Sequence, residues 1–218
     1  MEQNTLKESA YEYLKRRILT GELLPGQVII ERDIMDILTL GRTPVREALL
    51  LLQNENLVLM YPRKQTLVKP LAMQDILDLF SLRKMLEAQV LVQYLHQMDL
   101  LTLYEHDKKL QALVEQGKET APLTFYSQDI AFHEYLISCS NNAKLISVCK
   151  PLFLEGLRIG MLGVKTSHSK GMDETYRQHH RILEAIVGEN LSRIRQACVE
   201  HLNAAQISAL ETYRSFSL

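Results

Sequence analysis

The chain has 218 residues, of which 46% are hydrophobic and 23% are charged, and its formal net charge is −1. This composition is that of a folded globular protein and excludes a chain that is disordered throughout. No apolar run approaches the roughly 18 residues of a membrane span, and three cysteines are too few for a disulfide scaffold. The sequence therefore predicts a cytoplasmic protein without a membrane partner, rich in helix because helix-forming residues far outnumber glycine and proline.

The first 70 residues have the pattern of three helices followed by a hairpin. Apolar residues recur at helical spacing in the segments Leu6–Thr20, Glu31–Leu38 and Arg42–Asn54. In the second segment, Ile34, Ile37 and Leu38 form the predicted buried side. Two short strands, Leu57–Tyr61 and Thr66–Val68, follow, with a turn between them. This order predicts a winged helix-turn-helix domain over residues 1–70.

The third helix of this domain presents two different faces. Its predicted buried stripe consists of Val45, Ala48, Leu49 and Leu52. At about 100° per residue, Arg46 lies well away from this stripe and Thr43 lies nearly opposite it. In a winged helix-turn-helix the third helix enters the major groove of double-stranded DNA while the hairpin reaches a neighbouring groove or backbone. Candidate DNA contacts are therefore Arg32, Arg42, Thr43, Arg46, Arg63 and Lys64.

Taken singly, each of these basic residues is also consistent with an ordinary solvated surface. Residues 1–70 contain 10 Lys and Arg and 9 Asp and Glu, so their overall charge gives no support to DNA binding. The prediction depends instead on the local set of basic side chains at this spacing.

From Met73 onward the sequence predicts helices only. A long first helix passes through Ile76 and Leu91, and the others are Leu100–Gln116, Pro122–Cys139, Ala143–Leu162, Asp173–Val187 and Leu191–Phe216. Pro151 predicts a kink or break in the fourth. The fold class is therefore mainly α, with the winged helix-turn-helix followed by an all-α helical bundle over residues 71–218.

Four side chains of the bundle form a candidate metal site. Asp129 and His133 are four residues apart and share a helix face, while His179 and His201 lie on the last two helices. One carboxylate and three imidazoles suit zinc, nickel, manganese or iron, with coordination positions left open. From the spacing alone the signal is weak, because an Asp and a His four residues apart more often form a surface hydrogen bond.

Two stretches carry a resemblance to a known family. Ile18–Gly26 and the string Gly-Arg-Thr-Pro-Val-Arg-Glu-Ala-Leu at Gly41–Leu49 resemble the signature of the GntR family of bacterial transcription regulators. The resemblance implies DNA contacts from Arg32, Arg42, Arg46 and the region of Arg63 and Lys64. Gly41 departs from the family's usual serine, and Gln65 from the usual wing-tip glycine.

The bundle carries a second resemblance. Asp129–His133 is similar to the Asp-x-x-Phe-His motif of the FCD effector domain found in the FadR subfamily, and His179–Ile186 is similar to that domain's His-x-x-Ile-Leu-x-Ala-Ile. The resemblance implies that His179 rather than His180 is a metal ligand, and that His201 is the last one. It also implies a divalent metal, with zinc as the first choice. The six predicted helices match the shorter, VanR-like version of the domain.

Arg83 and Glu87 resemble the family's Arg-x-x-x-Glu pattern. Arg83 either faces the cavity and binds an effector carboxylate, or pairs with Glu87 along the helix, and Arg158 is a second candidate effector-binding arginine. The resemblance implies a homodimeric repressor that binds a pseudo-palindromic operator, responds to a small organic acid and is not an enzyme. A metal sensor and a metal-dependent hydrolase are the alternatives.

Overall fold

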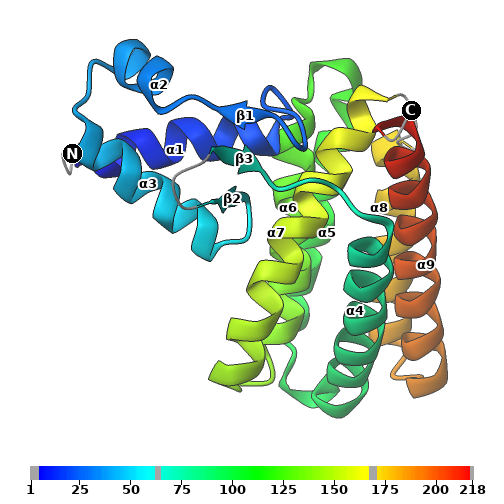
Figure 1. Cartoon of the computed structure of the whole chain (residues 1–218). Helices are drawn as coiled ribbons and strands as arrows, with labels where there is room; N and C mark the ends of the chain where they lie inside the picture. Colours follow the sequence, from blue (N-terminus) through cyan, green and yellow to red (C-terminus); the bar gives the residue numbers. More distant parts are fainter. Residues whose placement is uncertain (1–4, 62–64, 167–170, 217–218) are drawn as a thin grey trace. The chain divides into compact units, whose positions relative to one another are not determined.

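The computed structural model describes residues 5–61, 65–166 and 171–216. The chain divides into two compact units, Met1–Leu71 and Ala72–Leu218. Helices dominate both units, and the only strands in the described ranges are three short ones in the first unit (Figure 1). The predicted fold class is confirmed. None of the described helices combines the length and apolar character needed to cross a membrane.

The first unit contains three helices and a small sheet. Its elements are α1 (Leu6–Leu19), β1 (Val28–Ile29), α2 (Glu31–Leu38), α3 (Arg42–Asn54), β2 (Val58–Met60) and β3 (Thr66–Val68). The strands are antiparallel in the order β1-β3-β2, with Val28 opposite Leu67 and Val58 opposite Val68. Strand β1 was not predicted, because two residues are too few to show an alternating pattern.

The core of this unit lies where α1 and α2 pack on α3. The predicted stripe of α3 is fully buried, and Ile34 of α2 is buried with it. The prediction for Ile37 is wrong, because this side chain is 56% exposed. The buried side of α2 runs through Ile34, Met35 and Leu38. Ile37 lies about 100° from the centre of that side, beyond its edge.

In its described residues, the second unit is a bundle of six α-helices. They are α4 (Met73–Gln93), α5 (Leu100–Glu115), α6 (Pro122–Ser138), α7 (Ala143–Lys165), α8 (Gly171–Val187) and α9 (Leu191–Phe216), with short 3₁₀ turns at Leu95–Gln97 and Gly117–Glu119. Helix α7 continues through Pro151 and ends three residues later than predicted. A proline removes one backbone donor, and the apolar face of α7 supplies enough packing to keep the helix continuous.

The helices of the bundle enclose a common interior. Helix α4 packs on α9 and α6, α6 packs on α5 and α7, and α8 packs on α5 and α9 (Figure 1). Phe125 and Phe132 of α6 and Phe153 of α7 are among the largest fully buried side chains. Residues that point inward from α4, α6, α8 and α9 therefore meet inside the bundle.

Candidate metal centre and DNA-binding face

The bundle brings the four predicted ligands together. Asp129 and His133 extend from α6, His179 from α8 and His201 from α9, and one ligand atom of each lies within 4.8 Å of all the others. The three histidines are buried, and the side chain of Asp129 is 13% exposed. These four positions are far apart in the sequence, and the packing of α6, α8 and α9 makes them neighbours.

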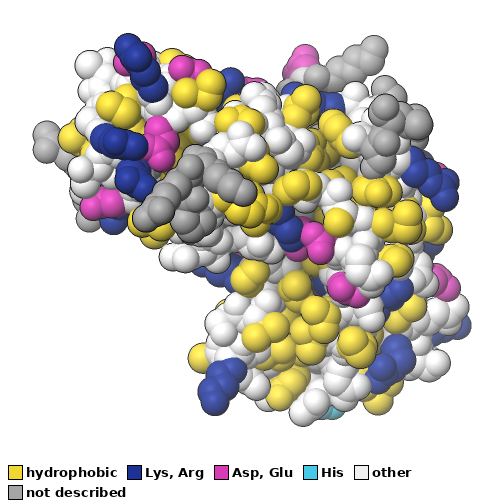
Figure 2. All heavy atoms as spheres, in the orientation of Figure 1, with side chains coloured by type: hydrophobic (Ala, Val, Ile, Leu, Met, Phe, Trp, Pro, Cys, Tyr) yellow, Lys and Arg dark blue, Asp and Glu magenta, His cyan; other side chains and the backbone are white. Residues whose placement is uncertain are grey.

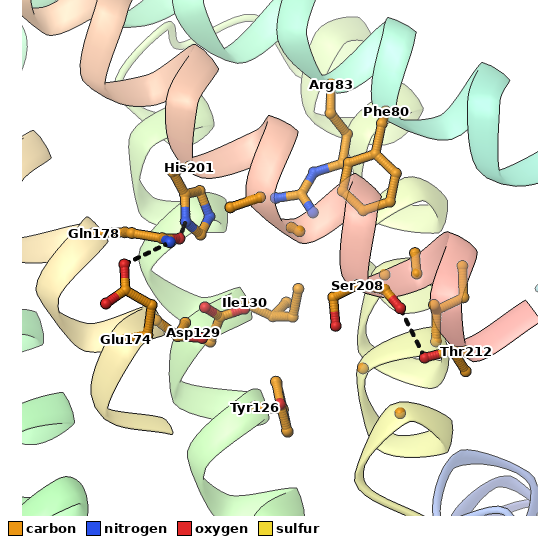
Figure 3. Close-up of a pocket in the computed structure, with 18 residues that line it drawn as sticks. Phe80, Arg83, Tyr126, Asp129, Ile130, Glu174, Gln178, His201, Ser208 and Thr212 are labelled. Atoms are coloured by element: carbon orange, nitrogen blue, oxygen red, sulfur yellow. Dashed lines mark hydrogen bonds between the residues drawn. The ribbon is translucent and has the colours of Figure 1, made fainter. Parts of the chain in front are cut away.

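Two further side chains set the protonation of two of the rings. Nδ1 of His133 lies 2.6 Å from Oε2 of Glu87, and Nδ1 of His201 lies 3.1 Å from Oε1 of Gln178. The amide of Gln178 is itself oriented, because its Nε2 donates to Glu174 Oε1 at 3.0 Å (Figure 3). With the proton of each ring on the Nδ1 atom that faces this oxygen, Nε2 of each ring keeps a lone pair that can bind a metal.

These lone pairs face each other in the interior. The Nε2 atoms of His133 and His201 are 3.2 Å apart, and Nε2 of His179 is 3.0 Å from Oδ1 of Asp129. Neither Oδ1 of Asp129 nor the ring nitrogens of His179 have a hydrogen-bond partner among the described residues. A metal bound at about 2.0–2.2 Å holds its ligand atoms roughly 3.0–3.5 Å apart. The donor set, its spacing and its unpartnered atoms fit a divalent transition metal.

The charge states of the cluster also suit a metal. Burial, followed by the neighbouring His179 and His133, lowers the pKa of His201 well below its ordinary value, and burial likewise lowers the pKa of His133. Burial opposes ionisation of Asp129, but the adjacent histidines outweigh it and lower the pKa of this carboxyl. These shifts favour the neutral imidazole at His133 and His201 and the ionised carboxylate at Asp129, which are the forms that bind metals.

A cavity lies beside the cluster, lined from α4, α6, α7, α8 and α9. Asp129 and His201 form one end, Ser208 and Thr212 the other, and Arg83 and Phe80 extend into it from α4 (Figure 3). Arg83 lines the cavity and also pairs with Glu87, whose Oε1 lies 2.6 Å from its Nε. Arg158 is buried on α7, but it is not among the residues that line this cavity.

Sequence reasoning missed two residues of the centre. Glu87 was paired with Arg83 only, and its contact with His133 joins α4 to α6. Gln178 carried no signal at all, because its role depends on where α9 places His201. The available indication that this face of α4 turns inward was that Arg83 and Glu87 continue the helical spacing of the apolar residues Ile76 and Phe80.

The predicted DNA-binding residues of the first unit are exposed. Side chains of Arg32, Arg42 and Arg46 are 87%, 70% and 55% exposed, and Thr43 is exposed beside them. Arg63 and Lys64 lie outside the described residues. Gly41 is the N-cap of α3 and provides no side-chain hydrogen bond, as its replacement of serine predicts.

A carboxylate accompanies the arginines. Glu31 at the start of α2 lies 3.3 Å from Nε of Arg42 and 3.8 Å from Nε of Arg46. Figure 2 shows one face of the molecule, on which basic and acidic side chains are interspersed over the surface. This mixture agrees with the near-neutral composition, so a DNA contact would depend on the few arginines of α2 and α3 and not on overall charge.

Comparisons with known proteins match both units. Residues 6–68 match the gntR family of bacterial regulatory proteins, and residues 78–204 match the FCD domain.

One curated relative comes from Streptomyces ambofaciens and is named an uncharacterized HTH-type transcriptional regulator in an unstable DNA locus. It is 28% identical to this chain over 201 residues, which are 92% of this chain and 83% of that protein. The gluconate operon transcriptional repressor of Bacillus subtilis is 30% identical over 129 residues, 59% of this chain and 52% of that protein. A GntR-type protein from Rhodococcus sp. RHA1 has a similar fold, with a TM-score of 0.76 at 22% identity over 94% of this chain and 97% of that one.

Proposed function

Because the chain belongs to the gntR family of bacterial regulatory proteins and carries an FCD domain, we propose that it is a homodimeric repressor controlled by a small organic acid. The matched families and relatives are transcriptional regulators and not enzymes, which removes the hydrolase alternative. Glu134, the carboxylate next to His133, is exposed and does not line the cavity, so it offers no general base there.

The first unit would bind the operator. Arg42 and Arg46 of α3 would contact base edges and phosphates in the major groove, with Arg32 and Thr43 beside them. The segment between β2 and β3, which contains Arg63 and Lys64, would contact the neighbouring DNA backbone. Two copies of the chain would read two half-sites about one helical turn apart, which predicts a pseudo-palindromic operator. Binding to chromosomal DNA would place this activity in the bacterial cytoplasm.

The second unit would bind the signal. The observation that carries this proposal is the 3.2 Å approach of the buried Nε2 atoms of His133 and His201, a spacing that a cation bound by both nitrogens would account for. Asp129, His133, His179 and His201 would hold the metal, with zinc as the first choice. When bound, the metal would supply a Lewis-acid site for a carboxylate oxygen, and Arg83 would contact the same group. The cavity beside the cluster favours an organic acid over the metal ion alone as the signal.

Metal analysis of the purified protein tests this proposal. We expect one divalent ion per chain in the wild type and none in the Asp129→Ala/His179→Ala variant. The control is His180→Ala, because His180 adjoins His179 in sequence but contacts Asp107 instead, and this variant should keep its metal. No metal in the wild type, even after incubation with zinc, would make the four residues a polar core and refute the proposed site.

A further inference from the structure

The proposed function gives no role to the buried carboxylate of Glu87. Its two oxygens contact two different partners: Oε1 lies 2.6 Å from Nε of Arg83, and Oε2 lies 2.6 Å from Nδ1 of His133. All three side chains are buried, so solvent does not screen these contacts. The positive charge of Arg83 is therefore already balanced before any effector enters the cavity.

The balance of charges at the cavity follows from these contacts. Arg83 and Glu87 cancel each other, and Asp129 cancels half the charge of a divalent ion. Histidines bind a metal as neutral imidazoles and add no charge to the loaded site. One net positive charge therefore remains when the metal is bound.

The rim of the cavity does not change this balance. Glu174 lines the cavity from α8, but its Oε1 lies 3.5 Å from Arg181 and its Oε2 lies 3.8 Å from Arg177. Arg177 in turn pairs with Asp173, so the rim is neutral overall and partly exposed to solvent. The charge that an effector meets is set by the buried groups.

The volume of the cavity limits the size of the effector. It measures about 90 Å³, and each water-sized group needs about 10–15 Å³, so the space suits roughly six to nine non-hydrogen atoms. Bulky ligands such as long acyl chains do not fit. Gly156 and Gly160 of α7 keep this space open, because a Cβ atom there would lie 3.2 Å from Arg83 Nη1 and from the ring of Tyr126.

We infer that Glu87 restricts this cavity to small carboxylates that carry a single negative charge. The inference rests on the proposed function, because it assumes a metal and a carboxylate effector in the same cavity. A singly charged acid neutralises the remaining positive charge of the loaded site. A second carboxylate would be buried without a partner, since the arginine that could pair with it is already paired with Glu87.

Matched pairs of acids test the inference on the zinc-loaded, full-length protein. Malate and its monoamide, and succinate and its monoamide, have equal numbers of non-hydrogen atoms and differ by one negative charge. We expect calorimetric titration to show that each monoamide binds at least about tenfold more tightly than its diacid. In the metal-free protein neither member of a pair should bind.

Two substitutions should move this preference in opposite directions. Glu87→Gln releases the charge of Arg83 and should bring the affinity ratio of monoamide to diacid down towards one or below it. Arg83→Gln removes a positive charge and should widen the ratio. If either residue had a merely structural role, its substitution would weaken the binding of both acids by the same factor and leave the affinity ratio unchanged. Glu184→Gln, which removes an exposed carboxylate of α8 outside the cavity, is the control and should keep the wild-type ratio.

The outcomes separate this inference from the function on which it rests. Tighter binding of the diacids by the wild type, or equal ratios in wild type and both cavity variants, would refute the role of Glu87 while leaving the carboxylate pocket in place. If none of the four acids bound the zinc-loaded wild type, the pocket itself would be refuted together with the inference.

Discussion

Arg42 and Arg46, the arginines proposed to contact bases, share one carboxylate, that of Glu31. Oε2 of Glu31 lies 3.3 Å from Nε of Arg42, and Oε1 lies 3.8 Å from Nε of Arg46, so both contacts are made at Nε and not at the terminal nitrogens that would meet DNA. Bidentate hydrogen bonds from arginine to guanine are the commonest specific contacts in the major groove. Because Glu31 limits the positions that each guanidinium can take, less conformational entropy is lost when the arginines meet bases.

We expect Arg46→Ala to weaken operator binding by about 1–3 kcal/mol and to relax specificity at one base-pair position. The measurement is a gel-shift titration with a duplex selected by the full-length protein from a random pool. Arg195→Ala removes the same charge from α9 of the second unit, where Arg195 bonds to Gln89, and should leave the affinity unchanged. Equal affinities of Arg46→Ala and wild type would remove Arg46 from the interface.

His106 is a titratable group outside the metal centre. Its Nδ1 lies 2.9 Å from Gln128 Nε2, and its ring stacks on Tyr135. Burial, followed by nearby Lys109, lowers the pKa of this imidazole below its ordinary value of 6.5. The folded state thus binds a proton less readily than the unfolded chain, so the stability that His106 contributes is present above about pH 6.5 and is lost as the pH falls below it.

The His106→Gln variant should therefore lose less stability on acidification than the wild type. The measurement is urea unfolding of both proteins, stripped of metal, at about pH 7.5 and about pH 5.5. Metal is removed beforehand because its release at low pH would also lower the free energy of unfolding. If the two proteins lose the same free energy of unfolding between these pH values, His106 does not titrate as described.

At the scale of elements, hydrophobic periodicity predicted the helices but missed a very short strand and misplaced one side chain of a short helix. All nine helices of the described chain were predicted, because each is at least eight residues long and has a buried face. Strand β1 has only two residues and was missed. Ile37 was misassigned because a helix as short as α2 leaves the edge of its buried side undefined.

The metal centre shows a different limit of prediction. Spacing suggested Asp129, His133, His179 and His201 only weakly, and the resemblance to the FCD motifs made them the predicted ligands without knowledge of the packing. The partners of those rings, Glu87 and Gln178, could not be predicted, because their contacts depend on the rotation of α4 and α8 against α6 and α9. A sequence specifies which side chains can bind a metal, whereas the side chains that orient them follow from packing.

Helix α7 offers a test of stability at this scale. The side chain of Asn142 caps its N-terminus by accepting hydrogen bonds from the backbone N–H groups of Lys144 and Leu145, both at 3.1 Å. We expect Asn142→Ala to lower the free energy of unfolding by about 1 kcal/mol, measured by urea denaturation. Asn142→Asp keeps an acceptor at the cap and should unfold as the wild type does. Equal stability of the alanine variant would show that water replaces the cap at no cost.

At the scale of the whole molecule, the proposed function divides two tasks between two units. The residues proposed to contact DNA are in the first unit and those proposed to bind the signal are in the second, so the signal must act over a distance. An effector changes DNA affinity only by as much as it prefers one arrangement of the protein to another. Linkage then requires operator DNA to weaken acid binding by the same factor by which the acid weakens operator binding.

An organic-acid sensor and a metal sensor differ in which ligand releases the operator. With zinc bound, we expect a monocarboxylate that fits the cavity to weaken operator binding by about 5–150-fold, whereas zinc alone should leave it unchanged. Fluorescence anisotropy of a labelled operator duplex, with zinc and acid titrated separately and together, measures each contribution. In the Asp129→Ala/His179→Ala variant the acid should have no effect on operator binding. The variant should still bind DNA, and its affinity should still fall steeply with salt, because the proposed phosphate contacts belong to the first unit. Release of the operator by zinc without any acid would identify the ion itself as the signal, and the cavity would then have no part in the response.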